Sequence, residues 1–414
     1  MQGFERALAL YGQALVLNPQ FAQAHIAIAG AWSTALEDRG VPQALANEKI
    51  EEHALAALNL NPNLGHAYKF LAQVRREQGN YEEAETLFRT ALELDPGNVH
   101  ILHGLGLTLR LRGRATESVT YYDRAAELDP LSPIINESRA SLLRDLGRFE
   151  EAEQQYQLTL NLDPKFSWAY WGLGTLHWSK GNPRGAAAWF EQAIQVAPQS
   201  DLFRSWLALM HLEQQRDEQA LAVIDETLRL VPISADNDIA LIDELYGIYH
   251  GLDVSGLPDG RWYLPVGMFG GLVQLPVRDL LAGNYTAAIE RYEAQYPGIS
   301  RGGMPVDGSN YRAATYVAFA LDRLGERSRA LELLDRVEMV LGNMRRLGIH
   351  GYWVTDAQIE IVRGDRSKAL RLLEAATQEG WRNLWRFFFF YDPILEALRN
   401  DSDFTSMAQR IEQE

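Results

Sequence analysis

The chain contains no cysteine among its 414 residues. Disulfide bonds, zinc sites built on thiolates, iron–sulfur clusters and a cysteine nucleophile are therefore all excluded. A chain without thiols is compatible with reducing and oxidising surroundings alike, so the compartment stays open, either cytoplasmic or periplasmic.

Long apolar runs are also missing. A membrane-spanning helix needs about 20 continuous apolar residues, whereas the weakly polar stretch 264–277 is shorter and is interrupted by Pro265 and Pro276. The first residues, MQGFERALALYGQ, contain charged and polar side chains where a signal peptide has a clean apolar segment. The sequence therefore predicts no direct membrane insertion.

The chain has no excess of positive charge. Lys and Arg total 39 against 55 for Asp and Glu, which gives a formal net charge of −16. Binding to phosphate backbones normally requires an excess of cations at the contact, so we expect no nucleic-acid partner. Hydrophobic residues at 47% and charged residues at 23% are typical of a folded chain, and the length exceeds that of one ordinary compact core.

Catalytic signatures are absent as well. The sequence contains no Walker-type phosphate loop, kinase signature or nucleophile-elbow serine. The pairs Gly104–Gly106 and Gly172–Gly174 fall inside expected helices and follow no strand, which excludes a dinucleotide loop. His100 and His103 lie one helical turn apart, but no third metal ligand accompanies them. We therefore expect no enzyme, no catalytic residue, no metal and no cofactor.

What the sequence does contain is a repeat. Prolines recur at intervals of 34 residues, with a glycine 17 residues before most of them and an aromatic residue eight before. The prolines are Pro62, Pro96, Pro130, Pro164, Pro198 and Pro232; the glycines are Gly79, Gly113, Gly147 and Gly181; the aromatic residues are Phe88, Tyr122, Tyr156 and Phe190. Two apolar stripes of helical period, separated by a glycine turn and ended by proline, predict a helical hairpin in each unit. One hairpin cannot bury both of its faces, so successive units are expected to stack into a solenoid with a concave face lined by the first helices.

The repeat resembles the tetratricopeptide repeat (TPR). The best single match is Tyr170–Leu173–Gly174–Gly181–Ala186–Phe190–Ala193–Pro198, and the motif covers residues 1–234. The resemblance implies an all-α, right-handed superhelix of about nine hairpins, with an initial half-repeat and a C-terminal capping helix. The expected segments are a half-repeat 1–21, six regular units in 22–234, a degenerate region with long loops 235–310, two degenerate units 311–380 and an aromatic cap 381–414.

A narrower resemblance concerns the phrases LDPLSPIIN at 128–136 and YDPILEALRNDSDF near the end of the chain. They are similar to TPR modules at the C-termini of bacterial signalling proteins, which join such arrays to class III adenylate cyclases, one-span winged-helix regulators or Ser/Thr kinases. The resemblance implies the interaction or sensory arm of such a protein. It also fits the initial half-repeat, which predicts that the chain is cut from a longer protein.

On the geometry of the TPR family, ten side chains are expected to face a partner in the concave groove. They are Lys69, Gln73, Arg76, His100, His103, Arg110, Arg144, Trp168, Trp171 and Trp178. The cations suit acidic groups, and the tryptophans either anchor an apolar part of a partner or pack as core between neighbouring helices. The main prediction is thus a non-catalytic scaffold that binds a protein or peptide segment.

Two alternatives remain. The half-repeat 1–21 exposes an apolar flank that a second copy of the chain would cover, which makes the protein a self-associating module. Alternatively, the chain is the regulatory part of an enzyme whose catalytic domain lies upstream, and the loops 251–265 or 297–310 contribute to its function.

Overall fold

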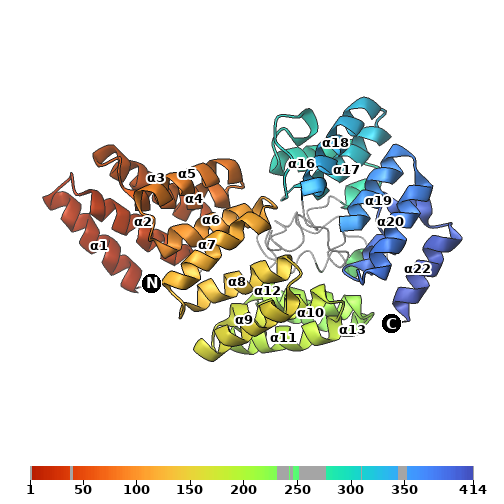
Figure 1. The fold of residues 1–414 in the computed structure, drawn as a ribbon, viewed down its shortest axis with the longest axis horizontal. Helices are drawn as coiled ribbons and strands as arrows, with labels where there is room; N and C mark the ends of the chain where they lie inside the picture. The colour runs from red at the N-terminus through yellow and green to blue at the C-terminus, as the bar shows by residue number, and fades with distance from the viewer. Residues whose placement is uncertain are drawn as a thin grey trace. The chain divides into compact units, whose positions relative to one another are not determined.

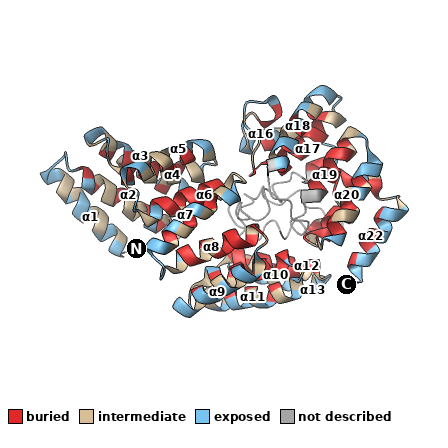
Figure 2. Ribbon diagram, viewed as in Figure 1, coloured by how far each residue is buried: buried red, intermediate tan, exposed pale blue. Residues whose placement is uncertain are grey.

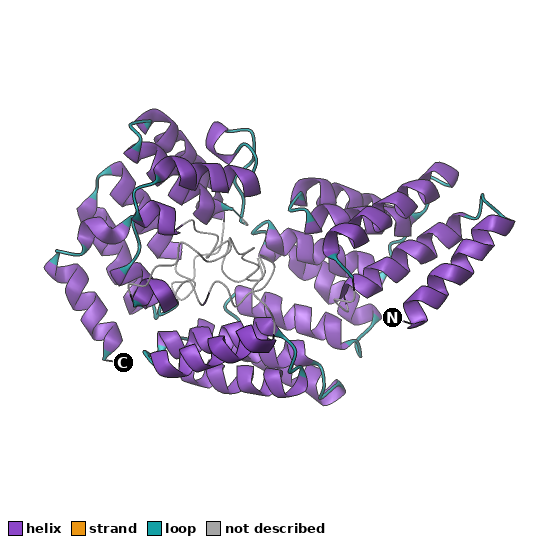
Figure 3. Cartoon of the chain, turned by 180° about the vertical axis from the view of Figure 1, so that it is seen from behind, coloured by secondary structure: helices purple, strands orange, loops and turns teal. Residues whose placement is uncertain are grey.

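The computed structural model describes residues 2–37, 41–230, 242, 246–250, 277–308, 310–343 and 352–413. These residues form helices and connecting loops, with no strand among them (Figure 3). None of the described helices combines the length and the apolarity that crossing a bilayer demands. The expected all-α fold is confirmed for these residues, whereas the predicted loop 251–265 lies outside them.

The chain divides into two compact units at the junction between Ser138 and Arg139, inside helix α8 (Pro133–Asp145). Unit 1 (1–138) begins with α1, and its later helices follow in pairs (Figure 1). They are α1 (Gln2–Leu17), α2 (Ala22–Glu37), α3 (Gln43–Leu60), α4 (Gly65–Glu77), α5 (Tyr81–Leu94), α6 (Val99–Leu111) and α7 (Ala115–Leu128). The five segments expected from the repeats are a finer division, and they stay a prediction.

Unit 2 (139–414) holds the remaining regular hairpins, the degenerate ones and the C-terminal cap. Its helices are α9 (Phe149–Leu162), α10 (Ser167–Ser179), α11 (Pro183–Val196), α12 (Asp201–Glu213), α13 (Asp217–Leu230), α15 (Val277–Leu281), α16 (Tyr285–Gln295), η1 (Ile299–Arg301), α17 (Tyr311–Arg323), α18 (Arg327–Asn343), α19 (Tyr352–Arg363), α20 (Arg366–Gln378), α21 (Trp385–Phe390), η3 (Leu395–Leu398) and α22 (Ser402–Glu412).

The glycine of each turn has a specific backbone role. Gly79, Gly113, Gly147 and Gly181 all have φ between +71° and +79°, a left-handed conformation that ends a helix and that glycine adopts at little cost. The equivalent position of hairpin α12–α13 carries Gln215, which adopts φ 56° without that advantage. The repeat therefore fixes where each hairpin turns, with one strained exception.

The first hairpin of unit 1 is longer than its neighbours. Helices α2 and α3 have 16 and 18 residues, against 13 and 14 in α4 and α5. Pro19 and Pro62 are 43 residues apart, against 34 in the regular repeats, and most of the surplus lengthens these two helices.

The cores of the two units differ in continuity. In unit 1 the buried apolar residues form small clusters, each shared by neighbouring hairpins. Unit 2 has one small cluster of the same kind around Tyr156. Its other cluster extends from Trp171 to Ile411, and α17 is buried along Tyr311–Leu321 on all sides (Figure 2). Apolar burial is the main stabilising term of folding, so unit 2 has the more cooperative core.

Candidate partner-binding surface

Six of the ten predicted partner-binding side chains lie on α4 and α6, the first helices of two successive hairpins of unit 1. The intervals of three, four and seven residues place each set on one side of its helix. Together with His66 of α4 they form a surface that we call the first-helix face; it comprises His66, Lys69, Gln73, Arg76, His100, His103 and Arg110. His66 and His100 are exposed and the other five are partly buried.

Several contacts fix the polar groups of the first-helix face. The Ser33 hydroxyl donates to Oε1 of Gln73 at 3.0 Å, which joins α2 to α4. Lys69 Nζ lies 3.7 Å from the centre of the Phe70 ring. Arg76 Nη2 donates to Oε1 of Glu77 at 2.9 Å. These contacts orient the side chains before any partner arrives.

His103 is the residue of the first-helix face on which several of its other side chains act. Burial, with the charges of Arg76, His100 and Arg110 adding to it, lowers the pKa of His103 to about 3. The imidazole is therefore neutral at pH 7, and its Nε2 lies 2.9 Å from the Ser138 hydroxyl. Arg76 of α4 and Arg110 of α6 therefore both act on this ring, in keeping with the contact between α4 and α6.

A carboxylate lies near the same cluster. Burial raises the pKa of Tyr122 to about 12, while Arg110 acts to lower it and Glu137 to raise it. The ring of Tyr122 packs edge-on against His103, with 5.8 Å between ring centres. The first-helix face is thus a cationic surface with two carboxylates beside it, those of Glu77 and Glu137.

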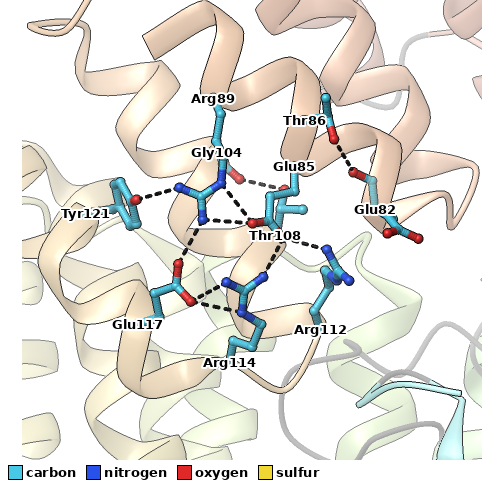
Figure 4. Close-up of polar contacts among 10 residues, drawn as sticks. All are labelled: Glu82, Glu85, Thr86, Arg89, Gly104, Thr108, Arg112, Arg114, Glu117 and Tyr121. Carbon is cyan, nitrogen blue, oxygen red and sulfur yellow. Dashed lines mark hydrogen bonds and ion pairs between the residues drawn. The ribbon is translucent and has the colours of Figure 1, made fainter. Parts of the chain in front are cut away.

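A network of ion pairs joins α5 to α7 and to the turn between α6 and α7 (Figure 4). The buried carboxylate of Glu85 accepts from Arg89 Nε at 2.9 Å, Arg112 Nη1 at 2.6 Å and Arg114 Nη1 at 2.7 Å. Burial alone would raise the pKa of Glu85, but the three arginines outweigh it and hold the pKa below its usual value. Glu117 bridges Arg89 and Arg114 a second time. This network keeps two successive hairpins, and hence the first-helix face, in a fixed arrangement.

The predicted site residues of unit 2 need correction. Trp171 is 4% exposed and Trp178 1% exposed, because the ring of Trp206 packs against both, at 6.1 and 4.8 Å between centres. Of the two interpretations that the sequence left open for them, core packing is the observed one. Trp168 is 42% exposed and packs edge-on against Trp171 and Phe203.

Arg144 is also not a surface residue. It is fully buried and donates through Nη1 to the Tyr156 hydroxyl at 3.0 Å and to Oγ1 of Thr175 at 2.8 Å. Its Nη2 donates to Oδ1 of Asp145 at 3.1 Å. A buried cation is retained because its N–H groups are paired, so Arg144 supports the hairpin core and is removed from the candidate site.

Trp206, Glu213 and Asp217 were not among the residues predicted from the sequence. Trp206 had a signal, since it lies 35 residues after Trp171, close to the repeat length. Glu213 and Asp217 contact residues about 170 positions away in the chain, and no local pattern indicates such a contact. Among the described residues, no group of three or more His, Asp or Glu side chains is arranged to hold a metal ion.

Comparison with known proteins places the repeat in a family. The tetratricopeptide repeat model matches residues 71–133, 137–201 and 172–235. Among solved structures, the chain is similar to YrrB, described as a TPR protein with an unusual peptide-binding site, at 23% identity and a TM-score of 0.34 over 45% of this chain and 92% of that one. It is similar to PilW, a type IV pilus biogenesis factor, at 20% identity and a TM-score of 0.42 over 50% and 95%.

A thermophilic TPR protein of Thermus thermophilus matches at 20% identity and a TM-score of 0.40 over 45% of this chain and all of that one. A search of curated proteins gave no significant match. The three matches cover residues 71–133 and, with an overlap, 137–235, and the chain folds its 34-residue units there as helical hairpins. The chain is therefore a tetratricopeptide-repeat protein and a protein-interaction scaffold.

Proposed function

We propose that the chain is a non-catalytic scaffold that binds an extended, acidic segment of a partner protein on the first-helix face of unit 1. The observation that carries the proposal is the gathering of cations from two successive first helices around His103. The chain as a whole has a net charge of −16, so the positive charge of this surface is opposite in sign to that of the chain.

The state of His103 supports an anionic ligand. The positive field that helps to lower its pKa to about 3 would stabilise a carboxylate bound at the same surface. A nucleic acid suits the surface less well, because a dense polyanion would also meet the surrounding negative charge of the chain. A peptide with a few carboxylates meets only the local cations.

The contacts that hold the cations favour a preformed surface. Gln73 is tied to Ser33, and the Glu85 network fixes the hairpins behind the face. A surface ordered in advance loses less conformational entropy on binding. The partner segment then binds with little rearrangement of α4 and α6.

The test uses a fluorescein-labelled decapeptide of glutamate, with a glutamine decapeptide as the neutral probe, and fluorescence anisotropy. Arg76→Glu combined with Arg110→Glu should weaken binding of the glutamate probe by about tenfold or more, that is about 1.4 kcal/mol or more. The glutamine probe should bind weakly to both proteins, and added salt should reduce the difference.

Arg124→Glu combined with Arg184→Glu is the matched control, because it makes the same charge change at two exposed residues outside the first-helix face. Arg124 lies on α7 and Arg184 on α11. If this control weakens the glutamate probe as much as the test variant does, binding follows net charge and the proposed surface is wrong. Unchanged binding in the Arg76 and Arg110 variant would contradict the proposal equally.

The resemblance of segments 128–136 and 391–404 to bacterial modules supports a finer role. We infer that the scaffold is the interaction or sensory arm of a bacterial signalling protein.

A second candidate, self-association, is favoured by one observation on α1. Tyr11 occupies the aromatic position of the repeat yet is 37% exposed, whereas Phe88 at the same position of α5 is 1% exposed. Val16 and Leu17 are also exposed on α1. If two copies pair through this apolar strip, sedimentation equilibrium will show a dimer that Tyr11→Glu dissociates, and a monomer at all concentrations excludes the pairing.

A further inference from the structure

The C-terminal cap of unit 2 contacts hairpin α12–α13, about 170 residues earlier in the chain. The backbone N–H of Leu384 donates to Oε2 of Glu213 at 2.8 Å. Arg386 forms a two-pronged ion pair with Asp217, at 2.8 Å from Nη1 to Oδ1 and 3.2 Å from Nη2 to Oδ2. Two carboxylates, one on each side of the α12–α13 turn, therefore hold one short segment. We call residues 380–391 the clasp.

The clasp also contacts two neighbouring elements of unit 2. The guanidinium of Arg386 lies 4.6 Å from the ring centre of Tyr249, and the Tyr391 hydroxyl donates to the Tyr249 carbonyl at 3.1 Å. At the α10–α11 turn, a Cβ on Gly181 would lie 3.3 Å from Cγ of Arg382, so the two segments are in close contact. The clasp thus connects the turns of two regular hairpins, α10–α11 and α12–α13, with the rest of the C-terminal cap.

The aromatic side chains of the clasp pack largely toward the C-terminal cap. Trp381 stacks with Phe389 and meets Phe388 edge-on, and Phe389 packs against Phe404 of α22 at 4.7 Å between centres. The direct polar contacts with α12 and α13 are hydrogen bonds and an ion pair. Separation would break them and expose clasp side chains such as Leu384 and Trp385, which share one apolar cluster with Trp178 and Trp206. The packing among Trp381, Phe389 and Phe404 would remain, so separation costs less than unfolding the cap.

Backbone strain is concentrated on both sides of the same junction. Among the described residues, the non-glycine residues with positive φ are Gln215, at 56°, and Leu384, at 52°. Each such residue costs about 1 kcal/mol or more and persists where the surroundings impose it. Gln215 takes the left-handed conformation of its own hairpin turn, whereas the backbone N–H of Leu384 is bonded across the junction to Glu213. The conformation of Leu384 is therefore the one that can relax on separation.

Glu213 links the contact to protonation. Burial raises the pKa of Glu213 to about 8, although the Leu384 N–H, the Trp178 indole and the Arg386 guanidinium all act to lower it. The other titratable groups at the junction are Asp217 on α13, Tyr249 and His250 on the segment 246–250, and Tyr391 on the clasp. His250 Nε2 lies 3.3 Å from Oδ2 of Asp217.

The sign of the linkage follows from the raised pKa. An exposed glutamate has a pKa near 4.3, so the closed state binds the proton of Glu213 more tightly than an open state does. The contribution of Glu213 to closure is therefore complete below pH 4 to 5 and is lost as the pH rises through about 8.

We propose that the clasp is a reversible closure of unit 2, which is closed while Glu213 carries its proton and opens as Glu213 ionises. Opening frees the C-terminal ends of α10 and α12, where Trp178 and Glu213 are buried in the closed state. The closure is a property of unit 2 and is independent of the peptide binding proposed for unit 1.

The absence of cysteine allows a direct test on the full chain. Glu218→Cys on α13 and Glu396→Cys on η3 introduce two exposed thiols on either side of the junction for spin labels. In pulsed electron paramagnetic resonance at pH 6 we expect one short distance between the two spin labels. A second, longer distance should appear as the pH rises, and its population should increase toward pH 9. Well below pH 8 each pH unit shifts the closing equilibrium by about tenfold, and the shift levels off above pH 8, so the change from pH 6 to pH 9 is about a hundredfold.

Glu213→Gln in the same labelled chain is the matched variant, because the amide keeps the size of the side chain and an acceptor for Leu384. It should stay closed at both pH values. A distance distribution of the wild-type pair that does not change with pH overturns the proposal, and so does a change that is equally large in Glu213→Gln.

Arg386→Ala provides a second variant if Glu213→Gln fails to fold. It removes the ion pair with Asp217 and should populate the longer distance already at pH 6, with unchanged helix content by circular dichroism. If Arg386→Ala remains closed at pH 6 and pH 9, the ion pair does not hold the clasp and the proposal is wrong.

Discussion

Glycines inside the first helices decide how closely neighbouring helices approach. Gly104 of α6 lies against the ring of Phe88, and Gly172 of α10 lies against the ring of Tyr156. A Cβ on Gly172 would be 2.6 Å from Cζ of that ring, far inside normal contact. These glycines are therefore packing positions, which explains why they occur within helices that glycine otherwise destabilises.

Gly172→Ala should destabilise unit 2 because the fully buried ring of Tyr156 cannot move freely. Its hydroxyl accepts from Arg144 at 3.0 Å and lies 2.9 Å from the Ser141 hydroxyl. We expect a loss of about 1–3 kcal/mol in the free energy of unfolding, measured by chemical denaturation with tryptophan fluorescence as the signal.

Gly342→Ala is the matched control, since Gly342 is an exposed helical residue of α18 with no atom within 4 Å of its Cβ position. It should leave unit 2 equally stable or stabilise it by up to about 1 kcal/mol. Equal stability of Gly172→Ala and the wild type would show that the close approach is not required.

The tryptophans show where residue-level prediction fails. Spacing placed Trp168, Trp171 and Trp178 on one stripe of α10, and spacing alone cannot tell a surface stripe from a buried one. Trp206 of the next hairpin covers two of the three. Deciding between the two interpretations required the structure of the neighbouring hairpin.

At the scale of elements, the 34-residue period predicted the regular hairpins because it records local chemistry. A glycine turn, a proline after the second helix and an aromatic residue opposite a small one each act within a single repeat or its neighbour. Contacts of longer range had no such signal. The clasp on Glu213 and Asp217 joins residues about 170 positions apart.

The insert 297–310 illustrates the same limit. Its described residues form a loop, with the short helix η1 in it, whose backbone is held by side chains outside it. The Glu293 carboxylate accepts from the N–H groups of Gly298 at 2.6 Å and Ser300 at 2.8 Å. Arg329 of α18 donates to the Ser300 carbonyl at 2.9 Å. A functional role for this loop stays a prediction.

At the scale of the whole molecule, the two units differ in their expected stability. The core of unit 1 consists of small clusters joined by networks such as that of Glu85, whereas one large cluster makes up most of the core of unit 2. Repeat arrays gain stability from the interfaces between neighbours, and a weaker interface divides the unfolding transition. Tryptophan separates the two signals, because Trp32 is the one tryptophan in residues 1–138 and all the others follow Arg139.

We therefore expect unit 1 to unfold at a lower temperature than unit 2, and Glu85→Ala to widen the gap. The substitution leaves the side chains of Arg89, Arg112 and Arg114 without their shared carboxylate, and because these arginines are partly exposed we expect a cost of about 1–3 kcal/mol. Circular dichroism at 222 nm follows both units, while tryptophan fluorescence follows mainly unit 2. Glu85→Ala should lower the midpoint temperature of the early dichroism transition and leave that of the fluorescence transition unchanged. Arg124→Ala, at an exposed residue of α7, is the control and should move neither midpoint. Coincident transitions in the wild type, or a fluorescence transition that shifts as far as the dichroism transition in Glu85→Ala, would mean that the chain unfolds as one cooperative array.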